Sequence, residues 1–469
     1  MKKTFITGFI LCFFLAVLSF NTSAQEYKYD ISKYYTPDIV RNQLDISFSG
    51  NGSFNTQTST NDSVFNNTMN GSLIPTFVMY KNTRKLVSQF QVNGSFQGQS
   101  SGSGKLNDIN NSFVATQSTS NLNIGYDVRF YNPKKLFLLL GIHGSIGEDG
   151  NMNHFNINSS VKTKAGNQNF DGGFGASIGV GFGRIESVED ARQAIYILDE
   201  LSKKGVLTRQ LSDDEIFQFA QQISRVKNKR FLDSRLHLID EITSVDSFFV
   251  SNHLLTKSDA TYFTTLYDYW QYGALNSRKS GHEFAISISP TVSLSSDNSL
   301  STDSLTWAHG YFNYFRRVLS ITYNYEKPVS LNWQHSANVT LNYNSTLYDR
   351  KTLPETNYPS TNSKYTNNDA NLYGSYYISY YPNTRTNYSV GLMQNFYFIS
   401  HDYMNGSTTS PENTFQSLTS FNLNASYYFS PQFRLSGNAG IGCNFQSSTD
   451  YKFSGLNGGI SASLIYSFY

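Results

Sequence analysis

Apolar and polar residues alternate with a period of two along most of the chain. In the stretch 433–445 the odd positions are apolar or small, and the even positions are Arg, Ser, Asn or Gly. The stretch 331–343 repeats the pattern, with Asn332, Gln334 and Asn338 on its polar face. This period is typical of β-strands that turn one face toward an apolar environment. Each run is long enough to cross a bilayer as a tilted strand.

The links between these runs are of two kinds that follow one another in turn. Tight polar turns occur at 82–84, 132–134, 326–329, 382–384 and 430–432, and longer links rich in Ser, Thr, Asn and Gly occur near 56–67, 98–111, 148–168, 295–306, 347–366 and 400–414. Short periplasmic turns and long external loops are typical of outer-membrane β-barrels. We therefore predict an all-β, antiparallel transmembrane barrel of about fourteen strands, with both termini in the periplasm.

Aromatic residues lie at or beside the tight turns, namely Tyr80, Tyr131, Tyr325, Tyr381 and Phe429. Barrels carry girdles of aromatic residues at the membrane–water interfaces. We therefore expect these five side chains to form the girdle on the periplasmic side of the membrane. A soluble β-sandwich also alternates, but it needs neither regular short and long links nor girdle aromatics.

The chain begins like an exported protein. Lys2 and Lys3 precede an apolar run at 9–20, and small residues suited to signal peptidase follow. The run is too short to span a bilayer. We expect residues 1–24 to be a signal peptide and residues 25–40 to be a short periplasmic segment.

The two-residue period is interrupted once, where a helical period replaces it. Ser187 is the expected N-cap of an amphipathic helix over 188–201, and Ser212 begins a second helix with acidic residues in its first turn. Further helices are expected over 232–242 and 259–270. About a third of the charged residues lie in this fifth of the chain, as in a small soluble helical domain.

This interruption divides the chain into three parts. We expect about six strands of the barrel in 41–184, a helical periplasmic insert in 185–280, and about eight strands in 281–469. The insert either packs on the barrel rim as decoration, or serves as a plug or a docking module. Glycines on the inward face of the strand before it favour a plug, because they let another backbone approach closely, but they equally fit barrel curvature.

The alternation also predicts which side chains line the lumen. They are Asp45, Asp127, Arg129, Gly175, Gly179, Gly183, Asn332, Gln334, Asn338, Tyr373, Tyr377 and Arg434. Charges are few, whereas channels for charged solutes normally show rings of like charge. We therefore expect an open pore either to favour neutral polar solutes or to discriminate weakly. The inward tyrosines either stack on sugars or fill space, and space-filling is the preferred interpretation.

Composition excludes several other classes. No stretch after residue 24 reaches the roughly 20 apolar residues of a membrane-spanning helix. Charged residues make up 15% of the chain and the net charge is +2, which argues against nucleic acid. Only Cys443 remains after the signal peptide, so no intrachain disulfide is expected. The eight histidines lack zinc-site spacing and no catalytic motif stands out, so we expect no metal, no cofactor and no enzymatic activity.

The last residues, 464–469, resemble the aromatic-ended terminal strand by which bacterial outer-membrane barrels are recognised for assembly. The resemblance is to this broad, porin-like class and implies outer-membrane lipid and the barrel-assembly machinery as partners. The strand count is shared with long-chain fatty-acid transporters, but those carry an N-terminal plug and residues 25–41 are too short for one. Two functions are predicted: a channel for small polar solutes, or a structural protein whose insert binds a periplasmic or envelope partner.

Overall fold

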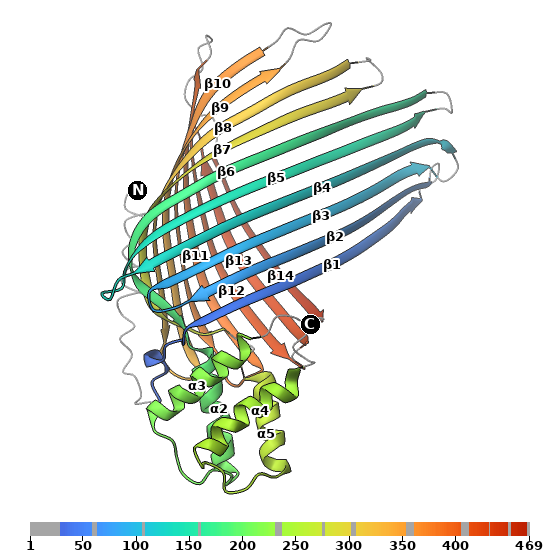
Figure 1. Ribbon diagram of the computed structural model, residues 1–469. Helices are drawn as coiled ribbons and strands as arrows, with labels where there is room; N and C mark the ends of the chain where they lie inside the picture. The colour runs from blue at the N-terminus through green and yellow to red at the C-terminus, as the bar shows by residue number, and fades with distance from the viewer. Residues whose placement is uncertain are drawn as a thin grey trace.

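The computed structural model contains one antiparallel sheet of fourteen strands, joined in sequential order from β1 to β14 (Figure 1). The structure describes residues 29–58, 63–105, 108–157, 161–229, 237–273, 277–301, 306–352, 361–404, 412–430, 432–448 and 452–466. The prediction of about fourteen antiparallel strands is confirmed. The signal-peptide prediction lies outside the described residues.

Six strands precede the helices and eight follow them. The strands are β1 (Ile39–Thr58), β2 (Ser63–Asn82), β3 (Leu86–Lys105), β4 (Asp108–Tyr131), β5 (Leu136–Ile157), β6 (Val161–Ser187), β7 (Lys279–Ser301), β8 (Thr306–Pro328), β9 (Trp333–Thr352), β10 (Thr361–Tyr380), β11 (Thr386–Met404), β12 (Glu412–Tyr428), β13 (Phe433–Ser447) and β14 (Lys452–Tyr466). The helices are η1 (Ile31–Lys33), α2 (Glu189–Lys203), α3 (Asp213–Lys227), α4 (Leu238–Ser251) and α5 (Ala260–Tyr272).

The strands are longer than the sequence pattern predicts. Much of each expected long link is paired strand: β1 and β2 are in register up to Thr58 and Ser63, and β5 and β6 up to Ile157 and Val161. A bilayer needs only about 9–11 residues of a tilted strand. Beyond the hydrocarbon both faces meet water, so the alternation that marks a strand disappears while the backbone pairing continues.

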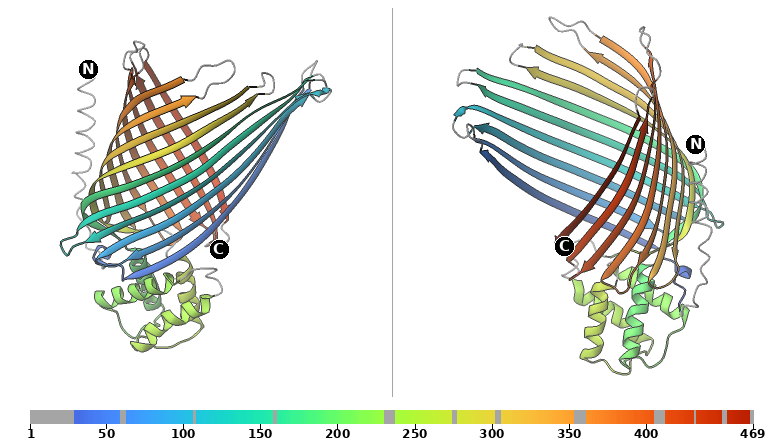
Figure 2. Two further views of the ribbon diagram at one scale, coloured as in Figure 1. Left: turned by 45° about the horizontal axis from the view of Figure 1, so that its top comes forward. Right: turned by 180° about the vertical axis from the view of Figure 1, so that it is seen from behind.

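The two faces of the sheet differ in chemistry. On β6, for example, Phe174, Ile178 and Val180 are each more than half exposed on one face, while Gly175, Ser177 and Gly179 occupy the other face. We call the apolar face the outer face and the polar face the inner face. Figures 1 and 2 show the sheet curled into a barrel-shaped wall whose edge strands are β1 and β14. Among the described residues, no recorded register joins these two edges.

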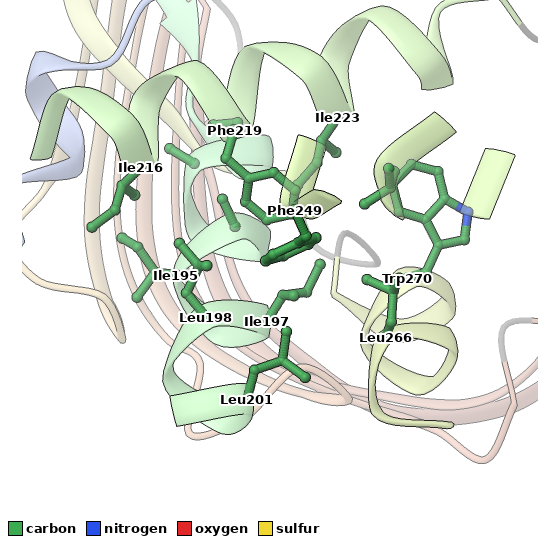
Figure 3. Packing of buried hydrophobic residues seen from close by; sticks show 14 of the residues in the cluster. Ile195, Ile197, Leu198, Leu201, Ile216, Phe219, Ile223, Phe249, Leu266 and Trp270 are labelled. Carbon is green, nitrogen blue, oxygen red and sulfur yellow. The ribbon is translucent and has the colours of Figure 1, made fainter. Parts of the chain in front are cut away.

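The helices form a separate small domain beyond the ends of the strands, on the side of the tight turns (Figure 2). Its core is made of buried side chains from all four longer helices, including Ile195, Leu201, Phe219, Phe249 and Leu266 (Figure 3). The ring of Phe219 contacts that of Phe249 at 4.9 Å between centroids. Within the described segments, none of the helices is long and apolar enough to cross a membrane.

The helix starts show which local signals decided the structure. Ser212 and Glu215 form a capping box at the start of α3, as acidic first-turn residues indicate. Asp259 caps α5 by accepting from the amide of Tyr262. Ser187 does not cap α2, because it still pairs with Lys279 as the last residue of β6. The helix therefore begins without a side-chain cap.

The N-terminal segment belongs to the helical domain. Ile31 and Tyr34 are almost fully buried in the helical core. The Tyr34 hydroxyl lies 3.0 Å from Oγ of Ser224 in α3, and burial with the nearby Asp190 carboxylate raises the pKa of Tyr34. Thr36 donates to the carbonyl of Ser187. Residues 29–38 thus connect the helical core to the start of β1.

Candidate functional site

Most residues predicted to line the lumen lie on the inner face of the sheet. Asp45 accepts from Nε2 of Gln43 at 2.7 Å, and Asp127 lies 3.5 Å from Nε2 of His143. Asn338 donates to the side chain of Asn324 at 2.6 Å. Such short links within and between strands cover the wall with polar side chains.

The remaining predicted polar and aromatic lumen residues divide by role. Arg434 is on the inner face, where it donates to the hydroxyl of Tyr428 at 3.2 Å. The ring of Tyr377 covers Gly391 of the neighbouring strand, so it fills space as the sequence suggested. Tyr373 shares the inner face of β10 with Tyr377, because the two are four residues apart on one strand.

The inward glycines of β6 do not admit a helix. Gly175, Gly179 and Gly183 are on the inner face, where a Cβ would meet atoms of the adjacent strand β7. At Gly181 a Cβ would also collide with the ring of Phe137. Gly183 has φ +92°, which L-residues rarely adopt. These glycines therefore allow β6 and β7 to approach closely and make room for Phe137.

A charged network lies on the inner face near the tight-turn ends of β4, β6 and β7. Arg129 pairs with Glu283 at 3.4 Å, and the Tyr131 hydroxyl donates to the same carboxylate. Arg184 pairs with Glu186 at 3.0 Å. Sequence analysis named only Arg129 of these charges as lumen-lining. The others sit at the junction with the insert, where the alternating pattern ends.

Only two of the five expected girdle aromatics are on the outer face. Tyr325 is opposite His282 there, and Phe429 is half exposed beside Tyr427. Tyr80 is opposite Arg41 on the inner face, and Tyr131 is also inward. The girdle prediction is wrong for this pair, because proximity to a turn does not determine the face of a strand.

Tyr381, the fifth expected girdle residue, lies between the barrel and the helical domain. Its side chain is 6% exposed, and the guanidinium groups of Arg192 and Arg278 lie 5.1 Å and 4.7 Å from its ring centre. It is therefore covered by protein rather than by lipid. The two arginines come from α2 and from the residue that precedes β7.

Arg278 holds the turn between β8 and β9. It is fully buried, and its Nε donates to Oε1 of Gln334 at 2.7 Å. Its two terminal nitrogens donate to the carbonyls of Leu331, Ser330 and Trp333 at 2.7 to 3.0 Å. Burial and the nearby Arg192 lower the pKa of Arg278 to about 10. Gln334 is thus a hydrogen-bond partner of Arg278 at the rim of the barrel.

Arg192 and Tyr196 extend the same contact from α2. Arg192 donates to the carbonyl of Asn383 at 3.1 Å, and the hydroxyl of Tyr196 donates to the side chain of Asn332 at 3.2 Å. The prediction that Asn332 lines the lumen is wrong, because it lies in the β8–β9 turn and faces the insert. A more exposed contact, Arg385 with Asp268 of α5 at 3.2 Å, completes the interface.

The arrangement offers a polar wall and a docked helical domain, and the described residues hold no group of three or more His, Cys, Asp or Glu side chains suited to a metal ion. No sequence signal links Arg192 and Arg278 to Tyr381, because they come from three separate segments. The docking interface was therefore missed by sequence analysis.

No protein-family model and no curated protein matches this chain. Among solved structures it is similar to the P. putida toluene transporter TodX, at 9% identity over 94% of each chain with a TM-score of 0.35. It is also similar to the translocator domain of autotransporter NalP from Neisseria meningitidis, at 8% identity over 100% of this chain and 98% of that one with a TM-score of 0.25. Because both TM-scores are low, strand order and register carry the assignment. Fourteen sequential antiparallel strands with an apolar outer face and a polar inner face give this chain the architecture of bacterial outer-membrane β-barrels.

Proposed function

We propose that this protein is a porin-like channel for small polar solutes. The observation that carries the proposal is the inner face, where amides and hydroxyls are linked across neighbouring strands and ion pairs such as Arg129 with Glu283 join charges of opposite sign. Asn438 donates to Asn424, for example, and Asn371 to Asn395. A wall without a ring of like charge favours neutral polar solutes.

The helical insert acts in this proposal as a docked module at the periplasmic mouth. Figure 2 shows the helices beyond the strand ends, and the contacts of Arg278 and Arg192 hold them to the β8–β9 and β10–β11 turns. The glycines of β6 pack against β7 and Phe137 instead of a helix. These observations support a docking role over a plug that threads the lumen.

A structural or anchoring role is the second candidate. The helical domain exposes Ile239 by 80%, Val250 by 57%, and Phe263 and Tyr267 by 43% each on α4 and α5. Apolar side chains on a small domain mark places where partners bind. In this alternative the barrel anchors the insert, and a periplasmic or envelope protein covers these side chains. Crosslinked pull-down with the full chain tests it, and failure to enrich any envelope component contradicts it.

Single-channel recording in planar bilayers tests the channel proposal. We expect the full chain to conduct, and a variant in which a short turn joins Ser187 to Lys279 to conduct at least as well. Complete absence of conductance in both proteins contradicts the proposal. The proposal further assigns outer-membrane lipid to the outer face and the barrel-assembly machinery to biogenesis, without enzymatic activity, a cofactor or nucleic acid.

A further inference from the structure

Three tyrosines lie side by side on the inner face of β8, β9 and β10. The register places Tyr314 opposite Tyr348, and Tyr348 opposite Tyr365. The rings of Tyr348 and Tyr365 stack at 4.6 Å between centroids with 20° between their planes, and the ring of Tyr314 lies 6.0 Å from that of Tyr348. Phe312 stacks on Tyr348 at 5.4 Å. We call these four residues the aromatic platform.

The aromatic platform differs from the space-filling tyrosine of the same wall. Tyr377 covers a glycine, whereas the platform rings contact one another and all four stay partly exposed. The platform also lies nearer to Thr306 than to Pro328 in β8, and hence toward the end of the strands away from the helices.

An arginine lies on the inner face on either side of the platform. Arg350 is opposite Phe312, one step beyond the tyrosine row, and Arg316 is opposite Thr346, one step before it. Both side chains are exposed, and no ion pair with a carboxylate is recorded for either within the described residues. Each step of two residues is about 6.7 Å, so about 13 Å separates the arginines along the strands. The distance between the two arginines is therefore better matched by a ligand of several sugar units than by a single sugar.

Hydrogen-bonding side chains continue the inner face beyond Arg316. Asn344 donates to the carboxylate of Asp369 at 2.5 Å, and the Tyr397 hydroxyl donates to the same carboxylate at 3.2 Å. These groups are paired with one another, but the buried Oδ1 of Asn344 has no hydrogen-bond partner among the described residues. A ligand rich in hydroxyls can pair with such polar groups.

We infer that the aromatic platform and its two arginines form a binding site for short acidic oligosaccharides. The C–H groups of the sugar rings pack against the partly exposed surface of the stacked aromatic rings. The guanidinium groups of Arg316 and Arg350 bind the carboxylates, and such charge-assisted bidentate pairs are strong and geometrically specific. The inference rests on the proposed channel, and it differs from that proposal in expecting acidic rather than neutral solutes to bind at this one site.

Current block in planar bilayers tests the inference with two probes of equal length, acidic trigalacturonate and neutral maltotriose. We expect trigalacturonate to block the full-length channel at a concentration at least tenfold lower than maltotriose. The advantage should shrink as ionic strength rises, because exposed charges are screened. The double variant Arg316→Gln with Arg350→Gln should lose the advantage.

The platform is tested separately from the charges. Tyr348→Leu should weaken block by both probes about tenfold, while Tyr348→Phe, which keeps the ring, should retain it. Tyr343→Leu is the matched control, because Tyr343 lies on the outer face of the same strand and is 48% exposed. Block of the Tyr343→Leu channel by each probe should equal block of the unchanged channel.

The outcomes separate the two proposals. A channel that conducts but is blocked equally by both probes, or whose block survives loss of both arginines, overturns the inference and leaves the channel standing. If the protein does not conduct, equilibrium dialysis of trigalacturonate against the full chain in detergent decides: binding that Tyr348→Leu abolishes supports the site, and absence of binding overturns it.

Discussion

Replacing Arg278 by methionine should release the helical domain from the barrel rim. The change removes four charge-assisted hydrogen bonds and leaves the carbonyls of Ser330, Leu331 and Trp333 without this donor. Hydrogen bonds to charged groups contribute about 1.5–3 kcal/mol each, but regained hydration of the guanidinium offsets much of the sum. A buried acceptor left without its donor costs about 1–3 kcal/mol, and with three carbonyls affected we expect a loss of about 3 kcal/mol or more.

Hydrogen exchange of the full chain in detergent measures this loss. Since about 1.4 kcal/mol is a factor of ten, amide protection in the β8–β9 turn and at the start of α2 should fall by at least about a hundredfold. Arg385→Met is the control, because its ion pair with Asp268 is partly exposed and such pairs contribute about 1 kcal/mol or less. Equal protection in the two variants would refute the assignment of docking to Arg278.

Three further changes test the insert and the wall. Ser212→Ala removes the α3 cap and should lower the free energy of unfolding by about 1 kcal/mol. Thermal unfolding measures this loss, and an unchanged unfolding temperature contradicts it. Burial and Asp190 raise the pKa of Glu189, so its carboxyl destabilises the fold progressively as pH rises from its ordinary pKa to the raised one. Glu189→Gln should therefore raise the unfolding temperature at pH 7 but not at pH 4, and an equal gain at both pH values contradicts this. Gly181→Val forces its side chain against Phe137 and should cost about 1–3 kcal/mol, seen as weaker heat resistance of the folded barrel in gel electrophoresis; unchanged resistance contradicts the close approach.

The strands were predictable because the bilayer imposes a simple rule. Lipid on one face and polar groups on the other produce alternation, so the number of runs predicted the number of strands. The rule applies only within the hydrocarbon region. The ends of β1, β2, β5 and β6 that lie away from the helices were therefore predicted to be links. Helix starts followed local capping chemistry at Ser212 and failed at Ser187, where strand pairing took precedence.

The candidate sites were harder to predict, because they depend on register. Tyr314, Tyr348 and Tyr365 are far apart in sequence, and only the pairing of three strands puts them in one row. Likewise, Tyr381 looked like a girdle residue because it follows a strand, yet it is buried beneath Arg192 and Arg278. Alternation predicts a face but not the depth or the neighbours of a side chain.

The pairing of Ser187 with Lys279 has a consequence for the order of folding. The amide of Val188 donates to the carbonyl of Arg278, so the two ends of a connection of roughly 90 residues lie as close together as the ends of a hairpin turn. Closing a loop of that length in an unfolded chain costs about 3 kcal/mol more entropy than closing a four-residue turn. A helical domain that folds first removes this penalty by bringing its own ends together. We therefore expect α2 to gain protection before β6 and β7 pair during refolding, and pulse labelling that shows the reverse order would contradict it. The insert then acts as a nucleus that joins the two halves of the sheet.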